Sequence, residues 1–221
     1  MAIARFKDIC VDAVDAGVLG RFWAAAAGLR WVPDGHGEGK LTGATPGHTI
    51  WVNRVPEERT VKQRVHLDLY SRTLEELEKL GARRLEDFPR WTIMADPEGG
   101  EFCAFLREEP PADRIHGLVV DSADPRAQAE WWREVYGAGI DHNGDEGWST
   151  VENVPGMPFL TMDFVPVPEP KTVKNRIHWD VTGEVGDLVA AGATVLRPRD
   201  ETIRWTVMAD PEGNEFCVFD A

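Results

Sequence analysis

The chain is poor in the features that mark secreted and membrane-spanning proteins. It has three cysteines among 221 residues, and a count that is both small and odd excludes a disulfide framework. No apolar stretch approaches the roughly 20 residues that a membrane-spanning helix needs. The chain does not open with a charged segment followed by an apolar run, as a secretory signal would. We therefore expect a cytoplasmic protein with no membrane partner.

Positive charge is also scarce. The 24 lysines and arginines are outnumbered by 38 aspartates and glutamates, which gives a formal net charge of −14. A surface this acidic repels phosphate backbones, so we expect no nucleic-acid partner. Hydrophobic residues make up 43% of the chain, which is enough for a packed core. The nine tryptophans are expected to fill cores or line pockets, as large aromatic side chains usually do.

The most informative feature is an internal repeat. The run TIMADPEGGEFCAF at 92–105 returns as TVMADPEGNEFCVF at 206–219, and VPEERTVKQRVHLDL at 55–69 returns as VPEPKTVKNRIHWDV at 167–181. A period of about 110 residues is too long for a solenoid unit and predicts a duplicated domain. We predict domains at 1–108 and 115–221, linked by the charged, proline-rich segment REEPPADR at 107–114.

Each half predicts the same order of elements. An opening strand is followed by a helix at 17–29 or 125–137, a strand at 49–55 or 158–165 and an alternating strand at 64–70 or 176–182. A short helix at 73–82 or 185–193 precedes a closing strand, turn and strand. Asp-Pro-Glu-Gly at 96–99 and 210–213 has the composition of a tight turn. The pattern predicts an α+β fold.

Alternation along the strands sorts their side chains into two faces. In RVHLDL at 64–69, the aliphatic residues share one face, which should carry a helix. His66 shares the other face with an arginine and an aspartate, and His178 does the same in the second copy. Cys103 and Cys217 each share a face with a glutamate and a phenylalanine. A sheet face that mixes histidine, cysteine, aspartate and aromatic residues predicts a small-molecule cavity.

These motifs together carry a resemblance. The histidine of RVHLDL and the closing ADPEGxEFC hairpin, both present twice, resemble the vicinal oxygen chelate superfamily of glyoxalases, bleomycin-resistance proteins and extradiol dioxygenases. The chain is most similar to actinobacterial two-domain glyoxalase-like proteins, over nearly its whole length. The resemblance implies paired βαβββ modules whose curled mixed sheets form cups with flanking helices. It also implies a monomer that acts as a fused pseudo-dimer, or a homodimer of such chains.

The resemblance also implies a divalent metal, Zn, Ni, Mn or Fe, at four strand positions in each cup. With crossed pairing of the halves, these positions fall on Asp8, Trp51, His178 and Cys217 in one cup and on Gly117, Asp163, His66 and Cys103 in the other. The family's final glutamate is thus replaced by cysteine in both copies. Gly117 offers no ligand, and alternation turns its neighbour His116 to the opposite face, so one cup could be degenerate. The candidate metal ligands are Asp8, His66, Cys103, Asp163, His178 and Cys217.

Plainer interpretations stay open for the same residues. The two histidines are equally explained as hydrogen-bonded structural residues, and the two cysteines as small buried hydrophobic residues. Five residues are predicted to bind substrate, as cup walls or clamps: Trp51, Arg64, Trp91, Arg176 and Trp205. The sequence assigns no catalytic residue.

Two functions remain. The first is binding of a small molecule in a cup between the paired domains, without the usual His/Glu metal triad and with no cofactor assigned. The second is an atypical divalent-metal-dependent lyase, isomerase or dioxygenase acting on a small oxygenated metabolite. The broken ligand set favours binding, and no motif names a substrate.

Overall fold

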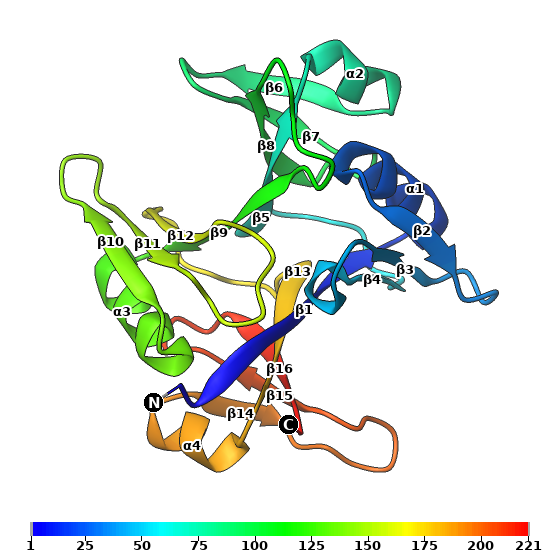
Figure 1. The fold of residues 1–221 in the computed structure, drawn as a ribbon. Coiled ribbons are helices and arrows are strands. Elements are labelled where there is room, and N and C mark those ends of the chain that lie inside the picture. The colour runs from blue at the N-terminus through cyan, green and yellow to red at the C-terminus, as the bar shows by residue number, and fades with distance from the viewer. Residues whose placement is uncertain (1, 221) are drawn as a thin grey trace.

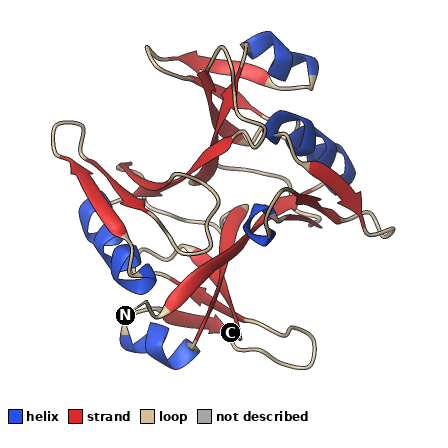
Figure 2. Ribbon diagram, viewed as in Figure 1, coloured by secondary structure: helices blue, strands red, loops and turns tan. Residues whose placement is uncertain are grey.

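The computed structural model describes residues 2–220 and contains two eight-stranded sheets (Figures 1 and 2). Sheet A consists of β1 (Ala4–Ala13), β2 (Arg30–Pro33), β3 (Gly39–Thr42), β4 (Ile50–Arg54), β13 (Ile177–Gly183), β14 (Thr194–Arg197), β15 (Thr206–Ala209) and β16 (Glu215–Phe219). Sheet B consists of β5 (Val65–Ser71), β6 (Arg83–Asp87), β7 (Thr92–Ala95), β8 (Glu101–Leu106), β9 (Ile115–Ser122), β10 (Gly139–Asn143), β11 (Trp148–Glu152) and β12 (Thr161–Pro166).

Each sheet joins a module of the first half to a module of the second. The strand order is β14-β15-β16-β13-β1-β4-β3-β2 in sheet A and β10-β11-β12-β9-β5-β8-β7-β6 in sheet B. The joins are the antiparallel pairs β1/β13 and β5/β9. The chain crosses from one sheet to the other through residues 55–64 and 167–176 (Figure 1). The α+β fold is confirmed, and so is the crossed pairing implied by the family resemblance.

The helices are α1 (Ala16–Ala27), α2 (Leu74–Lys79), α3 (Pro125–Tyr136), α4 (Val185–Ala190) and the 3₁₀ turn η1 (Pro46–His48). Asp15 caps α1 by accepting a hydrogen bond from the Val18 N–H, and Asp124 caps α3 in the same way. Both long helices end at a glycine with positive φ, Gly28 and Gly137, a conformation that glycine adopts without a Cβ clash. None of the described helices is long and apolar enough to cross a membrane.

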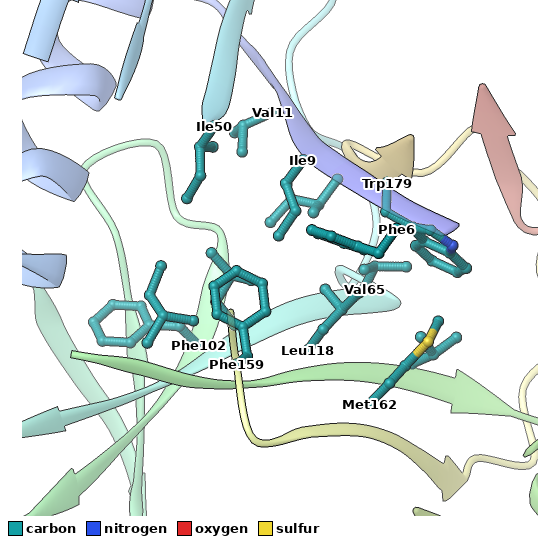
Figure 3. Close-up of a cluster of buried hydrophobic side chains, with 14 of the residues drawn as sticks. Phe6, Ile9, Val11, Ile50, Val65, Phe102, Leu118, Phe159, Met162 and Trp179 are labelled. Atoms are coloured by element: carbon teal, nitrogen blue, oxygen red, sulfur yellow. The ribbon is translucent and has the colours of Figure 1, made fainter. Parts of the chain in front are cut away.

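The two sheets share one hydrophobic core (Figure 3), and each long helix packs against both sheets. From α1, Trp23 reaches across to Phe102 of sheet B, with ring centroids 5.3 Å apart. From α3, Trp132 packs on Trp179 and Phe216 of sheet A. Truncating a buried indole of this kind costs about 3–5 kcal/mol. The aliphatic face of β5, predicted to carry a helix, lies in this core, so the polar faces of the sheets are left free for a site.

Three local features were not placed by the sequence: the hairpins β2–β3 and β10–β11, the strands β6 and β14, and a bulge in β1 with its counterpart in β9. The edge strands β6 and β14 are exposed along their whole length, so they lack the buried alternation that reveals a strand. A bulge interrupts β1 between Phe6 and Asp8, and a matching irregularity interrupts β9 between Ile115 and Gly117. Bulges shift the side chains that follow them to a new direction, and both of these lie beside the polar faces.

Candidate functional site

A cavity of about 460 Å³ opens on the polar face of sheet A. We call this face cup A and the matching face of sheet B cup B. The cavity is lined by Lys7, Cys10, Asp12, Trp51, Asn53, Lys174, His178, Asp180, Arg197, Ile203, Trp205, Val207, Glu215, Cys217 and Phe219. These residues come from both halves of the chain, because β1 and β4 belong to the first half and β13 to β16 to the second. Neither half alone contains the cup.

The floor of cup A follows from strand register. Asp8 on β1 lies opposite Asp180 on β13, which in turn lies beside Cys217 on β16. One strand repeat away, Cys10 lies opposite His178. Side chains two residues apart point to the same face of a strand. The register therefore collects two carboxyls, two thiols and an imidazole on three adjacent strands.

Asp8 and Asp180 form a carboxyl pair with a lysine beside it. The Lys7 ammonium lies 2.6 Å from Asp8 Oδ2 and 4.0 Å from Asp180 Oδ2, and Trp51 Nε1 donates to Asp8 Oδ2 at 3.1 Å. Burial, together with the charge and hydrogen bond of Asp8, raises the pKa of Asp180 well above its ordinary value. The raised pKa favours the protonated form of Asp180, and the Lys7 ammonium lies beside both carboxyl groups.

The histidine and thiols of the floor are uncharged. Burial lowers the pKa of His178 to about 4, and burial with the nearby Asp180 carboxyl raises the pKa of Cys10 and of Cys217. His178 Nε2 lies 3.6 Å from Cys217 Sγ and 3.8 Å from Asp180 Oδ1, and Cys10 Sγ lies 3.7 Å from Asp180 Oδ2. A protonated thiol is a weak nucleophile, so this arrangement does not activate either cysteine for covalent catalysis.

Aromatic rings form the walls of cup A. Trp205 stacks on Phe219 with centroids 5.5 Å apart and an interplanar angle of 29°. Trp51, on β4, is the other large aromatic lining residue. Cations already lie over two of these rings: Lys7 Nζ is 4.0 Å from the centroid of Phe219, and Lys40 Nζ is 4.9 Å from that of Trp51. The walls therefore offer ring faces to a flat molecule.

Cup B keeps part of this floor. His66 Nε2 lies 3.5 Å from Cys103 Sγ and 3.6 Å from Asp68 Oδ1, which repeats the spacing in cup A. Burial, with Lys62 nearby, lowers the pKa of His66 to about 3. The position of Asp8 is taken by Gly117, that of Cys10 by Val119 and that of Trp51 by Asp163. The Asp163 carboxylate accepts from Thr150 Oγ1 at 2.5 Å and from Thr161 Oγ1 at 2.7 Å.

His116 lies on the face of cup B, and the prediction that it points to the opposite face is wrong. Its ring stacks on Tyr70 with centroids 4.1 Å apart and meets the edge of Phe105 at 4.8 Å. The reason is the irregularity in β9, which breaks the alternation on which the prediction rested. His116 and Lys7 occupy matching bulges, and each packs on the matching phenylalanine of its cup.

The other predicted binding residues are placed as follows. Trp205 and Trp51 line the cavity of cup A, whereas Trp91 packs between Phe88 and Phe105 beside cup B. Arg64 donates to the Glu169 carbonyl and Arg176 to the Glu57 carbonyl. Both arginines line a separate hollow of about 970 Å³ between the crossing segments 55–64 and 167–176. These two hydrogen bonds join the crossing segments, and each segment donates one of them.

The structure brings together residues that the sequence did not assign to the site. Among the described residues, Cys10, His178 and Asp180 place potential ligand atoms within 4.8 Å of one another, and so do His66, Asp68 and Cys103. The two aspartates could have been found from the H-x-D spacing, which puts both side chains on one face. Lys7 could not, because only the bulge turns it toward the cup.

The fold is shared with proteins of known structure. Glyoxalase I from Zea mays matches with a TM-score of 0.71 at 11% identity, covering 98% of this chain and 92% of that one. A putative dioxygenase from Bacillus subtilis matches with a TM-score of 0.62 at 15% identity, covering 98% and 85%. The cppA protein from Streptococcus pneumoniae matches with a TM-score of 0.55 at 11% identity, covering 100% and 99%. At these identities the likeness concerns the fold.

Sequence comparison places both halves in one family. No curated protein matches the chain. The family described as "Glyoxalase-like domain" matches it twice, over residues 8–105 and 117–219. These two matches span most of the 221 residues, and the solved structures above share the fold over almost the whole chain. The chain therefore belongs to the glyoxalase-like domain family of the vicinal oxygen chelate superfamily, with two copies of the domain in tandem.

Proposed function

We propose that the chain binds a small planar molecule in cup A, without the metal triad of its superfamily. The observation that carries the proposal is the cavity of about 460 Å³, which has aromatic walls and a polar floor. Ligand pockets commonly have this composition, with apolar walls for affinity and a few polar groups for orientation. A volume of this size lies within the range of small-molecule sites, about 300–1,000 Å³.

The charges of the cup favour a ligand with a cationic or hydrogen-bond-donating end. Asp8 and Asp180 place two carboxyl groups at the floor beside the single ammonium of Lys7, and ring faces attract cations by about 0.5–2 kcal/mol. The negative charge of the whole chain adds long-range steering of a cation toward it. A flat ring would lie against Trp205 and Trp51, with its donor group directed to the carboxyl pair. Binding of this kind requires no bond to be made or broken.

The residues at the family's four metal positions do not fit the family's metal. In cup A, one Asp8 oxygen, Oδ2, is held by Lys7 and by the Trp51 indole, which leaves only Oδ1 without a partner among the described residues. The Trp51 side chain has no ligand atom to offer. In cup B, Gly117 offers no ligand and both oxygens of Asp163 accept hydrogen bonds from threonines. We therefore derive no catalytic step through a metal at these positions.

The second candidate is an atypical metal-dependent lyase, isomerase or dioxygenase. The His–Cys–Asp cluster on each cup floor supports it, because an imidazole, a thiolate and a carboxylate are ligands for divalent metals. It is the weaker candidate, since no group on the floor is placed as an activated base or nucleophile. Turnover of a small oxygenated metabolite that depends on added metal would favour it over simple binding.

We further propose that the chain works as a fused pseudo-dimer. Each cup takes strands from both predicted domains, 1–108 and 115–221, so one chain supplies both sides of each cup. A second copy is not needed to complete the site. Native mass measurement would test this, and a cavity that forms only in a homodimer would contradict it.

The test of binding compares the two cups. We expect planar cations such as acridinium compounds to quench tryptophan fluorescence, and matched neutral or anionic aromatic compounds to bind more weakly. Trp205→Ala should weaken binding by about tenfold, because a stacked aromatic contact is worth roughly 1–3 kcal/mol. The matched change Trp91→Ala, beside cup B, should leave affinity near the wild-type value. Calorimetry is the readout for both variants, because each loses an indole reporter. Equal losses in both variants, or no binding by any probe, would refute the proposal.

A further inference from the structure

The floor of cup A holds a second arrangement of donors, displaced from the family's metal positions. Cys10, His178 and Asp180 place their ligand atoms within 4.8 Å of one another. Cys217 Sγ lies 3.6 Å from His178 Nε2 and so adjoins the same cluster. Only His178 and Cys217 belong to the family's four positions. Cys10 and Asp180 lie one strand repeat from Asp8 and His178 respectively, and they bring a second thiol and a free carboxyl oxygen.

Three of the separations among these donors match those around a tetrahedral ion. Cys217 Sγ adjoins His178 but is not part of the group of Cys10, His178 and Asp180 whose ligand atoms all lie within 4.8 Å of one another. Zinc bonds of about 2.3 Å to sulfur and about 2.0 Å to nitrogen or oxygen place neighbouring ligands roughly 3.3–3.8 Å apart. The distances are 3.7 Å from Cys10 Sγ to Asp180 Oδ2 and 3.8 Å from Asp180 Oδ1 to His178 Nε2. The third distance, 3.6 Å from His178 Nε2 to Cys217 Sγ, lies in the same range.

One carboxyl oxygen of Asp180 lies in this cluster without a hydrogen-bond partner. Within the described part of the chain, Asp180 Oδ1 is buried without a hydrogen-bond partner, and the whole residue is 2% exposed. A buried carboxyl oxygen without a partner is costly. A cation among Asp180, His178 and the thiols would satisfy it.

The surroundings offset part of the charge of such a site. Two thiolates and one carboxylate around a divalent ion leave a net charge of −1, and the Lys7 ammonium, which also pairs with Asp8, lies 4.0 Å from Asp180 Oδ2. On binding, the thiol and carboxyl protons pass to solvent, as metal coordination by such ligands requires. Neither the metal nor the protein changes oxidation state.

We propose that cup A is a site for one thiophilic divalent metal ion, zinc in the first place, held by Cys10, His178, Asp180 and Cys217. Sulfur ligands select zinc over hard ions such as magnesium or calcium. Cup B retains the matching His66, Asp68 and Cys103 but has Val119 where cup A has Cys10. Cup B is therefore the weaker, three-donor version within the same chain.

The test uses the full chain, stripped of metal by a chelator and kept reduced with a phosphine. Titration with Co²⁺ should give one tight equivalent, with a near-ultraviolet sulfur-to-cobalt charge-transfer band and the strong visible bands of tetrahedral cobalt. Zinc should displace it. Cys10→Val copies cup B and should weaken cobalt binding at the tight site by about 100-fold. Losing a residue that only supports a ligand costs roughly 10–100-fold in affinity, and losing a ligand itself costs at least as much. Cys103→Ala should leave the tight site unchanged.

A gain-of-function variant keeps the proposal testable if Cys10→Val destabilises the fold. Val119→Cys places the fourth donor in cup B, and we expect a second tight cobalt equivalent with its own sulfur band. The proposal is overturned if cobalt binds without a sulfur charge-transfer band, if folded Cys10→Val keeps wild-type affinity, or if the stripped chain takes up no metal. These readouts are independent of the tryptophan-based ligand test, so either proposal can fail while the other stands.

Discussion

Cup A and cup B have the same construction and different floors. In both, a histidine, an aspartate and a cysteine lie at matching positions of β13 and β16 or of β5 and β8. Cup A adds Asp8, Cys10 and Trp51, where cup B has Gly117, Val119 and Asp163. All three differences come from the opening module of each half. The closing modules, which contain the strongly repeated motifs, have kept the same chemistry.

The comparison separates what the fold needs from what a site needs. The apolar faces of β5 and β13 and the Asp-Pro-Glu-Gly turns recur because both sheets depend on the shared core. The polar faces of β1 and β9 are free of that requirement, so they can differ in charge. Cup A places its additional carboxylate, Asp8, beside the Lys7 ammonium. The carboxylate that only cup B has, Asp163, accepts hydrogen bonds from two threonines instead of pairing with a lysine. We therefore expect that exchanging these residues between the cups lowers the free energy of unfolding by amounts that depend on the charge that each exchange adds or removes.

The largest effect is expected from Gly117→Asp, which gives cup B the carboxyl of cup A without its lysine. A Cβ at this position would lie 3.1 Å from Thr161 Oγ1 and 3.4 Å from Asp163 Oδ2, so the new charge would be buried beside Asp163 and Asp68. We expect the free energy of unfolding at pH 7 to fall by about 4 kcal/mol, the cost of an unpaired buried charge. Urea unfolding measures it.

Two companion variants isolate the charge in that experiment. Gly117→Ala carries the same Cβ without the carboxyl and should cost about 1 kcal/mol, a typical effect of mild crowding. Adding His116→Lys to Gly117→Asp should recover about half of the loss, because it supplies the cation that Lys7 supplies in cup A. If Gly117→Ala is as damaging as Gly117→Asp, space rather than charge separates the two cups.

A smaller loss is expected from Lys7→Met, which makes the floor of cup A electrostatically unbalanced. Removing one partner of a buried ion pair costs about 3–5 kcal/mol, and the Lys7 side chain is 28% exposed, so we expect a loss of about 2–3 kcal/mol. His116→Met at the matching bulge of cup B removes no ion pair and should cost less. Thermal and urea unfolding of the two variants decide the order, and the reverse order would contradict the charge balance assigned to cup A.

The buried histidines should make stability depend on pH. Burial lowers the pKa of His66 to about 3 and that of His178 to about 4, below the ordinary value of about 6.5. As pH falls below 6.5, the unfolded chain binds protons that the native chain does not, so each histidine lowers stability. His66→Gln and His178→Gln should each remove about 2.5–3 kcal/mol of the loss between pH 6.5 and pH 4.

The two histidines are distinguished below pH 4. His178 begins to take up its proton in the native state near that pH, so its contribution levels off, whereas that of His66 continues to grow toward pH 3. The measurement is the free energy of unfolding of wild type minus that of each variant across this range. Curves that stay parallel to wild type would show that neither histidine is held neutral.

The smallest effect is expected at the mouth of cup B. Arg90 and Glu146 form an ion pair at 3.3 Å, and both side chains are more than half exposed. Exposed pairs of this kind contribute about 0–1 kcal/mol and weaken in salt. Arg90→Ala should therefore change stability by less than about 1 kcal/mol, as measured by urea unfolding at low and high salt. A larger loss would mean that the Arg90–Glu146 contact stabilises cup B more than an exposed ion pair usually does.

The sequence predicted most of the framework because the repeat exposes it. The long helices, the alternating strands and the Asp-Pro-Glu-Gly turns follow from patterns present twice, whereas the crossed assembly was implied by the family resemblance. The edge strands β6 and β14 escaped prediction because every residue in them is exposed. Exposed strands are stabilised by pairing with a neighbour rather than by a buried face, and pairing leaves no periodic signal.

The site was predicted less completely, for a local reason. Alternation grouped His178 with Asp180, and the family resemblance placed Asp8, Trp51 and Cys217 in the same cup. Trp51 and Cys217 line its cavity, and Asp8 lies opposite Asp180 on its floor. Alternation failed where it was interrupted, at the bulges that turn Lys7 and His116 onto the cup faces. A bulge is set by the pairing of two distant strands, so it leaves no trace in the residues on either side of it.

The crossed sheets change what the linker between β8 and β9 does. Its residues 108 and 109 are exposed to any protease, yet the fragments on either side of a cut would not be two independent bodies. Each fragment contributes four strands to sheet A and four to sheet B, and all of these strands share one core. A nicked chain would therefore run as two bands on a denaturing gel and as a single particle in a native mass measurement. In the folded molecule the covalent link is dispensable, and its importance lies in bringing the two halves together while they fold.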